Sequence, residues 1–282
     1  MTTVREAIIW IQESLHTQGI ENAAAESRWI VSHVLNVESI ELLLDPDRMI
    51  AEVDWRKLLD LANRRGAMEP LQHILGDVEF CGCHLVVSPD VLIPRPETEW
   101  LVETALELAD TPTGILDIGT GSGAIAIAIA SLLPSSIVSA IDRCPAALLV
   151  ARTNGAKNDV MDRLRFMRAD LHALPFSPNS FDLIISNPPY IRNGEISNLE
   201  PEVRNHEPLL ALDGGPDGLT CYRSIASQFC HLLKPGGMLA IELPGQPPEP
   251  IVELFSERSD TPPEVRSDWI GKPRLLTVQS ST

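Results

Sequence analysis

Strand-like and helix-like stretches alternate through the last two thirds of this 282-residue chain. Short apolar runs of the kind found in buried strands are separated by longer stretches with helical spacing of apolar residues. We therefore predict an α/β fold: a doubly wound, mostly parallel sheet with helices on both faces. The expected strands are 114–118, 137–141, 164–167, 181–186, 238–243 and 274–279, and the expected helices are 97–109, 124–133, 145–154, 220–233 and 250–256.

The first 75 residues show only the helical pattern. Thr3 and Glu6 form a capping-box pattern at the start of the first expected helix. A second helix over 23–35 is expected to bury one apolar face, and short helical segments follow at 40–44 and 55–63; the residues expected on the buried face are Ala24, Trp29, Ile30 and Val34. We predict a helical-bundle domain over 1–75, which serves either as a stabilising cap or as a docking surface for a protein substrate.

A hairpin is expected between the two regions. Breaks occur at Glu69-Pro70 and at Gly76, and the pattern over 78–87 suits two short strands with Gly82 near the turn. Three prolines follow and stiffen the chain. We assign 76–96 to a hairpin linker and 97–282 to the catalytic domain.

Composition narrows the classes of partner. The formal net charge is -17, which argues against a partner bound mainly through phosphates, so we expect no direct nucleic-acid binding. No apolar run reaches the ~18 residues of a membrane span, and no basic-then-apolar leader opens the chain, so we expect a cytoplasmic protein without membrane contact. The five cysteines include no Cys-x-x-Cys pair, and we assign no metal site.

The sharpest local pattern is a glycine turn between a buried strand and an apolar helix. Glycines permit a tight turn and close approach of the backbone to a ligand. A dinucleotide site would have Gly-x-Gly-x-x-Gly spacing, whereas this turn has Gly-x-Gly-x-Gly after an acid. That pattern favours a ligand without phosphates, whose amino group needs a nearby carboxylate. The candidate residues are Asp117, Gly119, Thr120, Gly121, Ser122 and Gly123.

Two further acids follow the next two expected strands. Asp142 ends one strand, where a carboxylate can accept hydrogen bonds from ribose hydroxyls. Asp170, beside apolar Leu171, follows the other strand, where an adenine amino group would lie. The three strand ends together predict an adenosyl site.

A neutral, proline-rich loop, Asn187-Pro188-Pro189-Tyr190, follows the expected strand 181–186. A carboxamide nitrogen is a poor nucleophile, so it has to be oriented by acceptors that do not protonate it. The Asn187 oxygen and the Pro188 carbonyl can each accept one N–H, and Tyr190 offers a flat face to clamp a planar group. The loop therefore predicts a catalytic and substrate-binding site for methyl transfer to an amide or amine nitrogen.

Taken together, these motifs resemble those of the protein-(glutamine-N5) methyltransferases that modify peptide chain release factors. The resemblance covers nearly the whole chain, and its parts differ in specificity. The glycine turn is shared by many adenosylmethionine enzymes, and Asn-Pro-Pro-Tyr by many amino-methylating enzymes. The most specific stretches are Ile-Pro-Arg-Pro-Glu-Thr-Glu within 91–99 and Glu-Pro…Asp-Gly-Leu within 207–219.

The resemblance implies a Rossmann-like methyltransferase sheet, S-adenosyl-L-methionine as cofactor, and a release factor as partner. The substrate would be the glutamine of the Gly-Gly-Gln loop, and the helical N-terminal domain would contact the substrate protein. Gly119–Gly123, Asp142, Asp170-Leu171 and Asn187 would bind the cofactor, and Asn187–Tyr190 the glutamine.

One region departs from the family pattern. The stretch Glu242–Pro248 lacks the glycine expected two residues after its acid, so the loop is expected to have another shape. The ending Asp268–Arg274 keeps the family spacing of acid, glycine and arginine. We expect neither region to touch the core chemistry.

Two other functions share parts of this pattern. An enzyme that methylates an exocyclic amine, as on adenine in a nucleic acid, or one with another protein substrate, would use the same loop; for nucleic acid it would need a basic face. A non-catalytic adenosyl-binding module would dispense with Asn187 or the glycine turn, and both are present. Which release factor would be used stays open.

Overall fold

The computed structural model describes residues 2–281; residues 1 and 282, at the outer ends of the first and last predicted domains, lie outside the described residues. The chain divides into two compact units. The first contains the residues up to Gly76 together with Glu200–His206, and the second contains Asp77–Leu199 and the residues from Glu207 onward. The two units divide after Gly76, next to the boundary expected after residue 75, and Glu200–His206 of the expected catalytic domain belongs to the first unit.

Apart from an isolated bridge between Thr3 and Met49, the described secondary structure of the first unit, the helical unit, consists of helices. They are α1 (Val4–Thr17), α2 (Ala23–Leu35), α3 (Ser39–Leu44), α4 (Glu52–Gly66), α5 (Leu71–Leu75) and, from the later segment, α9 (Pro201–His206). Along α1 the residues Val4, Ala7, Ile11 and Leu15 are buried, which is the helical spacing expected of a core-facing stripe. The Thr3 side chain accepts from the Glu6 N–H and Glu6 accepts from the Thr3 N–H, which confirms the capping box.

Helix α2 presents a different face from the predicted one. Ala24 is exposed and Trp29 is half exposed, whereas Ala23, Ile30 and Val31 are buried. Two polar residues of α2, Glu26 and Ser27, are also buried. The expectation that Ala24 and Trp29 are buried was wrong, because the buried face was predicted from the positions of apolar residues alone.

Glu26 is buried because it has a charged partner. Arg65 of α4 donates to Glu26 over 2.6 Å and to Glu202 of α9 over 3.2 Å, with the Arg65 side chain only 5% exposed. Buried charges persist in folded proteins when they are paired and hydrogen-bonded. This triad joins residues from three helices of the unit, one of them far along the chain.

The second unit holds a hairpin, a central sheet and the helices that cover it. Its strands are β1 (Asp77–Phe80), β2 (Cys83–Val86), β3 (Gly114–Ile118), β4 (Ile137–Asp142), β5 (Leu164–Arg168), β6 (Phe181–Ser186), β7 (Leu233–Glu242), β8 (Glu264–Ser267) and β9 (Pro273–Gln279). Its helices are α6 (Pro96–Leu108), α7 (Ala124–Leu132), α8 (Pro145–Lys157), α10 (Leu209–Leu212), α11 (Thr220–Ala226), α12 (Phe229–Leu232) and α13 (Glu249–Ser256), with 3-10 turns at Met161–Arg163 and Asn193–Asn198.

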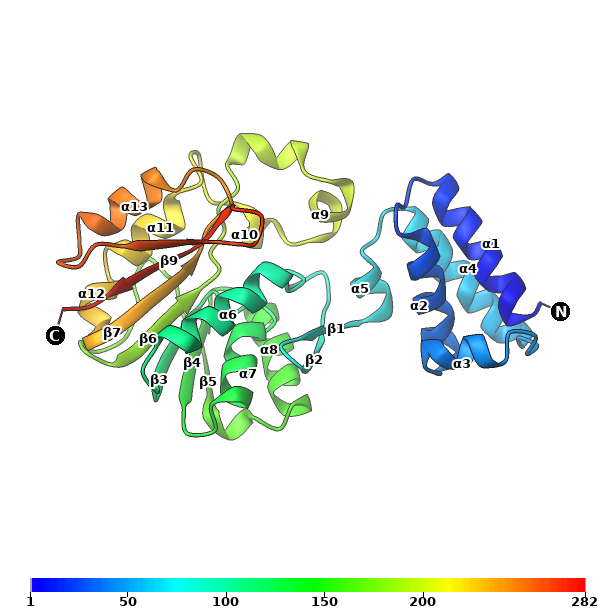
Figure 1. Cartoon of the computed structure of the whole chain (residues 1–282), viewed down its shortest axis with the longest axis horizontal. Coiled ribbons are helices and arrows are strands. Elements are labelled where there is room, and N and C mark those ends of the chain that lie inside the picture. Colours follow the sequence, from blue (N-terminus) through cyan, green and yellow to red (C-terminus); the bar gives the residue numbers. More distant parts are fainter. Residues whose placement is uncertain (1, 282) are drawn as a thin grey trace. The chain divides into compact units, whose positions relative to one another are not determined.

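Seven strands form one sheet in the order β5-β4-β3-β6-β7-β9-β8. The first five are parallel, and β9 runs antiparallel to both of its neighbours. Alternate residues of a strand point to opposite faces. On β3, Ile115 packs with α6, α7 and α8, and Leu116 packs with α11, α12 and α13. The two sets of helices cover opposite faces of the sheet (Figure 1), which confirms the doubly wound, mostly parallel arrangement.

Some predicted elements differ in detail. The single helix expected over 220–233 is two short helices, α11 and α12, because the chain turns at Ser227 and Gln228. Strand β7 begins at Leu233, ahead of the expected 238, and β8 was not predicted. Among residues 2–281, no helix is both long and apolar enough to cross a membrane.

Candidate functional site

The carboxyl ends of β3, β4 and β6 meet at one edge of the sheet. In register, Ile118 lies beside Ile141 on one side and beside Ser186 on the other. The Ser186 hydroxyl donates to the Ile118 carbonyl over 2.7 Å and ties the ends of β3 and β6 together. The glycine turn, Asp142 and the Asn187 loop therefore start from neighbouring positions, as the sequence predicted.

A cavity of about 560 Å³ opens at this edge. Of the predicted site residues, those that line it are Gly119, Gly121, Asp142, Leu171, Asn187 and Pro189. The lining that the structure describes does not include Asp117, Thr120, Ser122, Gly123, Asp170, Pro188 and Tyr190. The predicted residues are thus divided between the cavity wall and its surroundings.

Asp142 is fixed from both sides. One carboxylate oxygen accepts from the Gly121 N–H over 2.9 Å, and the other accepts from the Cys144 N–H over 2.8 Å. Gly119 and Gly121 both have positive φ, so the turn can bring its backbone close to this carboxylate. Each carboxylate oxygen keeps lone-pair capacity for a further donor, as ribose hydroxyls would require.

Asp117 lies behind the turn and is fully buried. It accepts from the Thr120 hydroxyl over 2.6 Å, and its second oxygen has no hydrogen-bond partner in the described part of the chain. Burial raises the pKa of Asp117 to about 7. A buried acceptor of this kind fits a cofactor that brings a positively charged amino group to the turn.

Asp170 occupies a different place. Its carboxylate accepts from the His172 N–H over 3.0 Å, and it lines a smaller, separate hollow with Arg143 and Arg168. Its neighbours Leu171 and His172 line the main cavity instead. The sequence analysis assigned no role to His172, although its position two residues after Asp170 could have indicated that it lies near the site.

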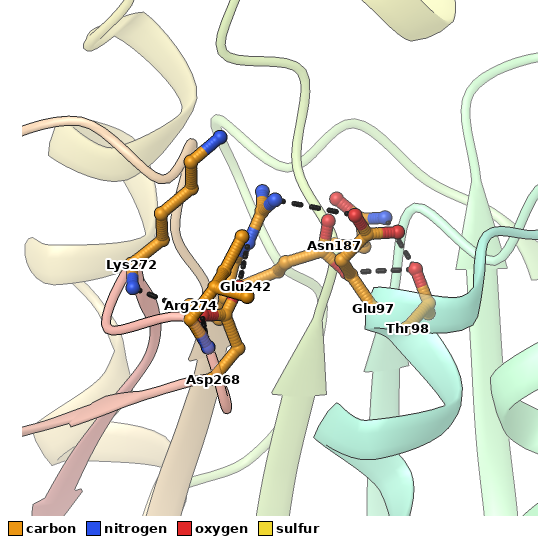
Figure 2. A network of polar contacts seen from close by, with 8 residues as sticks. Glu97, Thr98, Asn187, Glu242, Asp268, Lys272 and Arg274 are labelled. Atoms are coloured by element: carbon orange, nitrogen blue, oxygen red, sulfur yellow. Dashed lines mark hydrogen bonds and ion pairs between the residues drawn. The ribbon is translucent and has the colours of Figure 1, made fainter.

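The Asn187 loop is held by a chain of polar contacts (Figure 2). The Asn187 side-chain N–H donates to the Thr98 hydroxyl over 2.9 Å, and that hydroxyl donates to the Glu242 carboxyl over 2.7 Å. Thr98 is at the start of α6 and Glu242 is at the end of β7, and both are buried. The expectation that the Glu242 stretch would not touch the core chemistry is wrong in this respect.

Further polar contacts surround these hydrogen-bonded side chains. Arg274 of β9 donates to Glu97 over 3.2 Å and to Asp268 over 3.1 Å, and the Tyr222 hydroxyl donates to the Glu242 carbonyl over 2.8 Å. Burial raises the pKa of Glu242 to about 7 against the opposing effect of the Thr98 hydrogen bond.

The two most specific stretches of sequence meet at the site. Arg95 forms an ion pair with Glu207, whose side chain is almost completely buried. Gly214 and Gly218 pack against the backbone of Tyr190: a Cβ on Gly214 would lie 2.7 Å from the Tyr190 Cα, and a Cβ on Gly218 would lie 2.5 Å from its carbonyl oxygen. The stretches within 91–99 and 207–219 therefore hold the loop from two sides.

Tyr190 itself is only partly exposed. Burial raises the pKa of its hydroxyl to about 12, so the ring stays neutral at physiological pH. Among residues 2–281, no three His, Cys, Asp or Glu side chains gather as a metal site would require.

The sheet order and the cavity at its edge are compatible with a methyltransferase that uses S-adenosylmethionine, and the comparisons show that the chain belongs to this class. A family profile described as "Methyltransferase domain" matches residues 110–272, and one described as "PrmC N-terminal domain" matches residues 6–76. A methyltransferase from Pyrococcus furiosus has a similar fold, with a TM-score of 0.55 at 19% identity over 71% of this chain and 90% of that one.

Full-length relatives identify the family. The chain is 40% identical to a release factor glutamine methyltransferase of Geobacter sulfurreducens, over 90% of this chain and 88% of the relative. It is 39% identical to one of Gloeobacter violaceus, over 95% of each chain. The chain belongs to the release factor glutamine methyltransferase family, and its cofactor is S-adenosyl-L-methionine.

Proposed function

We propose that this chain methylates the side-chain amide nitrogen of the glutamine in the Gly-Gly-Gln loop of a peptide chain release factor. The observation that carries the proposal is the direction of the Asn187 amide. Its nitrogen is engaged by Thr98, which leaves its oxygen as the acceptor in a loop that lines the cavity. A substrate amide has two N–H groups and needs acceptors of this kind.

In this proposal the Asn187 oxygen accepts one N–H of the glutamine and the Pro188 carbonyl accepts the other. Pro189 stiffens the loop, and Tyr190 clamps the planar amide. Neither acceptor carries a formal charge, so neither removes the proton prematurely. The methyl group takes the place of one N–H proton of the glutamine amide, and that proton passes to water. Positioning of this type can supply about 7–11 kcal/mol at best.

The cofactor residues follow from the same edge of the sheet. We assign Asp142 to the ribose hydroxyls, and the backbone of Gly119–Gly123 with Asp117 to the amino-acid portion. Asp170 and Leu171 are assigned to the adenine. When bound, S-adenosylmethionine supplies a methyl group on a positively charged sulfur.

The test is methyl transfer to an intact release factor, followed by mass spectrometry of the Gly-Gly-Gln peptide. We expect one added methyl group on the glutamine and none when that glutamine is replaced. Total RNA serves as the competing substrate. Methylation of the replaced protein, or of RNA alone, would overturn the proposal and favour an exocyclic amine as acceptor.

We further propose that the helical unit recognises the release factor. Its exposed apolar side chains include Trp29, which is 50% exposed on α2. Removal of residues 1–75 would test this poorly, because Glu202 would lose Arg65. A point change, Trp29→Ala, is expected to raise the KM for intact release factor several-fold at unchanged kcat. Leu132→Ala, at a 51% exposed position of the other unit, is the matched control. Equal KM values for the two variants would contradict the assignment.

A further inference from the structure

Three side chains form a directional chain of hydrogen bonds at the Asn187 loop. A threonine hydroxyl has one proton to donate, and an ionised carboxylate can only accept. Because Thr98 donates its proton to Glu242, it can only accept from Asn187. The ionised carboxylate therefore decides which end of the Asn187 amide faces Thr98.

We propose that Thr98 and Glu242 are positioning residues that hold the Asn187 carboxamide with its oxygen toward the substrate amide. This inference rests on the proposed function and explains why the oxygen of the Asn187 amide, rather than its nitrogen, faces the substrate. An asparagine amide can rotate by half a turn with little change in shape, and the rotated form would present N–H donors to the N–H groups of the substrate. Only the partner of the amide can select one form over the other.

The surrounding residues hold these three hydrogen-bonded side chains in place. Thr98 is 4% exposed and Glu242 is 2% exposed, so water does not compete for either group. Helix α6 packs against both β7 and β9, which holds Thr98 and Glu242 together although they are 144 positions apart. The Tyr222 hydroxyl anchors the Glu242 backbone from the opposite face of the sheet.

Protonation of Glu242 reverses the direction of the hydrogen bonds between Glu242, Thr98 and Asn187. A carboxylic acid can donate to Thr98, whose own proton is then available to the Asn187 oxygen, and the amide nitrogen turns toward the substrate. The charged and titratable groups near Glu242 are Glu97, which opposes its ionisation, Arg274 and Arg95, which favour it, and the neutral phenols of Tyr190 and Tyr222. Burial is the largest effect on Glu242 and, together with these charges, raises its pKa to about 7. We therefore expect kcat to rise as pH increases through about 7.

The experiment compares variants at Thr98 with one at Glu242. Thr98→Val keeps the shape and removes the hydroxyl, and it is expected to lower kcat about 10- to 100-fold while cofactor affinity stays unchanged. Thr98→Ser is expected to restore most of the activity. Thr104→Val, at another buried threonine of α6, is the matched control and should retain wild-type kcat. Glu242→Gln is expected to abolish the dependence of kcat on pH between about 6 and 8.

Coupling to Asn187 separates positioning from a general structural role. If Thr98 acts through Asn187, the double variant Thr98→Val/Asn187→Ala should be no slower than Asn187→Ala alone. Multiplication of the two losses would overturn the inference. Wild-type kcat and pH profile in Thr98→Val would overturn it as well.

An NMR measurement that needs no methyl transfer tests this inference separately from the proposed substrate. The side-chain amide signals of Asn187, assigned by their loss in Asn187→Ala, should shift in NMR spectra with a midpoint near pH 7 in the wild type and not in Glu242→Gln. Absence of that shift would refute the relay even in an active enzyme. Its presence in a protein that fails to methylate release factor would refute only the proposed substrate.

Discussion

The side of the cavity that we assign to the cofactor and the side that we assign to the substrate are built in different ways. On the cofactor side, Asp142 contacts the backbone of Gly121 and Cys144, which are 21 and 2 positions away. On the substrate side, Asn187 contacts Thr98, 89 positions away, and Thr98 contacts Glu242, 144 positions away. Backbone turns near a strand end thus form one half, and side chains from three distant elements form the other. Sequence changes far from the loop can therefore alter the substrate half alone.

The largest expected effect is at the centre of the substrate side. Asn187→Ala deletes the proposed acceptor, and we expect kcat to fall about 100- to 1,000-fold, comparable to loss of a preorganised hydrogen-bonding group in other enzymes. Cofactor affinity, measured by calorimetric titration, should stay within a few-fold. Full turnover at saturating substrate would remove the distinction between the two halves.

Glu242 should also affect folding stability, in a predictable direction. Its pKa is about 7 in the folded protein against 4.5 in an unfolded chain, so the folded state binds more protons between these pH values. The free energy of unfolding should fall as pH rises from about 4.5 to 7, by on the order of 3 kcal/mol. Asp117 contributes a loss in the same direction.

Urea unfolding of the wild type and Glu242→Gln at several pH values isolates the contribution of Glu242, because Asp117 is present in both proteins. The variant should lose less stability than the wild type over this pH range. Parallel curves for the two proteins would show that Glu242 is not buried in an ionisable state. The same ionisation that activates Asn187 in our proposal is thus expected to destabilise the fold.

On the cofactor side, Asp142→Ala is expected to weaken S-adenosylmethionine binding about 10- to 100-fold, as loss of a charge-assisted hydrogen bond would. Because ribose contacts are alike in the ground and transition states, kcat at saturation should change much less. Asp170→Ala removes the carboxylate that we assign to the adenine but that lies outside the main cavity lining, and it is expected to weaken cofactor binding less than Asp142→Ala. Unchanged affinity in Asp142→Ala would refute the ribose assignment.

The smallest expected effect tests the packing around Tyr190. A Cβ in Gly214→Ala would approach the Tyr190 Cα, so the loop has to shift, and we expect about a tenfold loss of kcat with cofactor affinity retained. Gly194→Ala is the matched control, since a Cβ there would meet no atom within 4 Å. Equal kinetics for both variants would show that the loop tolerates displacement.

The sequence predicted most of the fold because the strands are short, apolar and separated by regular helices. The α2 face and the helix over 220–233 were wrong for related reasons. Burial of Glu26 depends on Arg65 from another helix, and the turn at Ser227 lies inside a stretch that is apolar enough to read as one helix. Local patterns do not contain such tertiary information.

The same limit applies to the site. The glycine turn and Asn187 could be found because each follows a recognisable strand. The roles of Thr98, Glu207 and Glu242 could not be found from spacing, since their partners lie far along the chain. The family resemblance did mark the stretches that contain Thr98 and Glu207, although it gave no reason for them.

The buried Arg65 has a consequence for the order of events during protein synthesis. Glu26 leaves the ribosome before Arg65, but Glu202 follows Arg65 by 137 positions. At about 5–20 residues per second, that second carboxylate arrives roughly 7–27 s later. The helical unit therefore receives its last helix, α9, only after four of the seven strands of the central sheet, β3 to β6, have been made. Nascent-chain proteolysis should accordingly detect a late gain in protection of the first 76 residues.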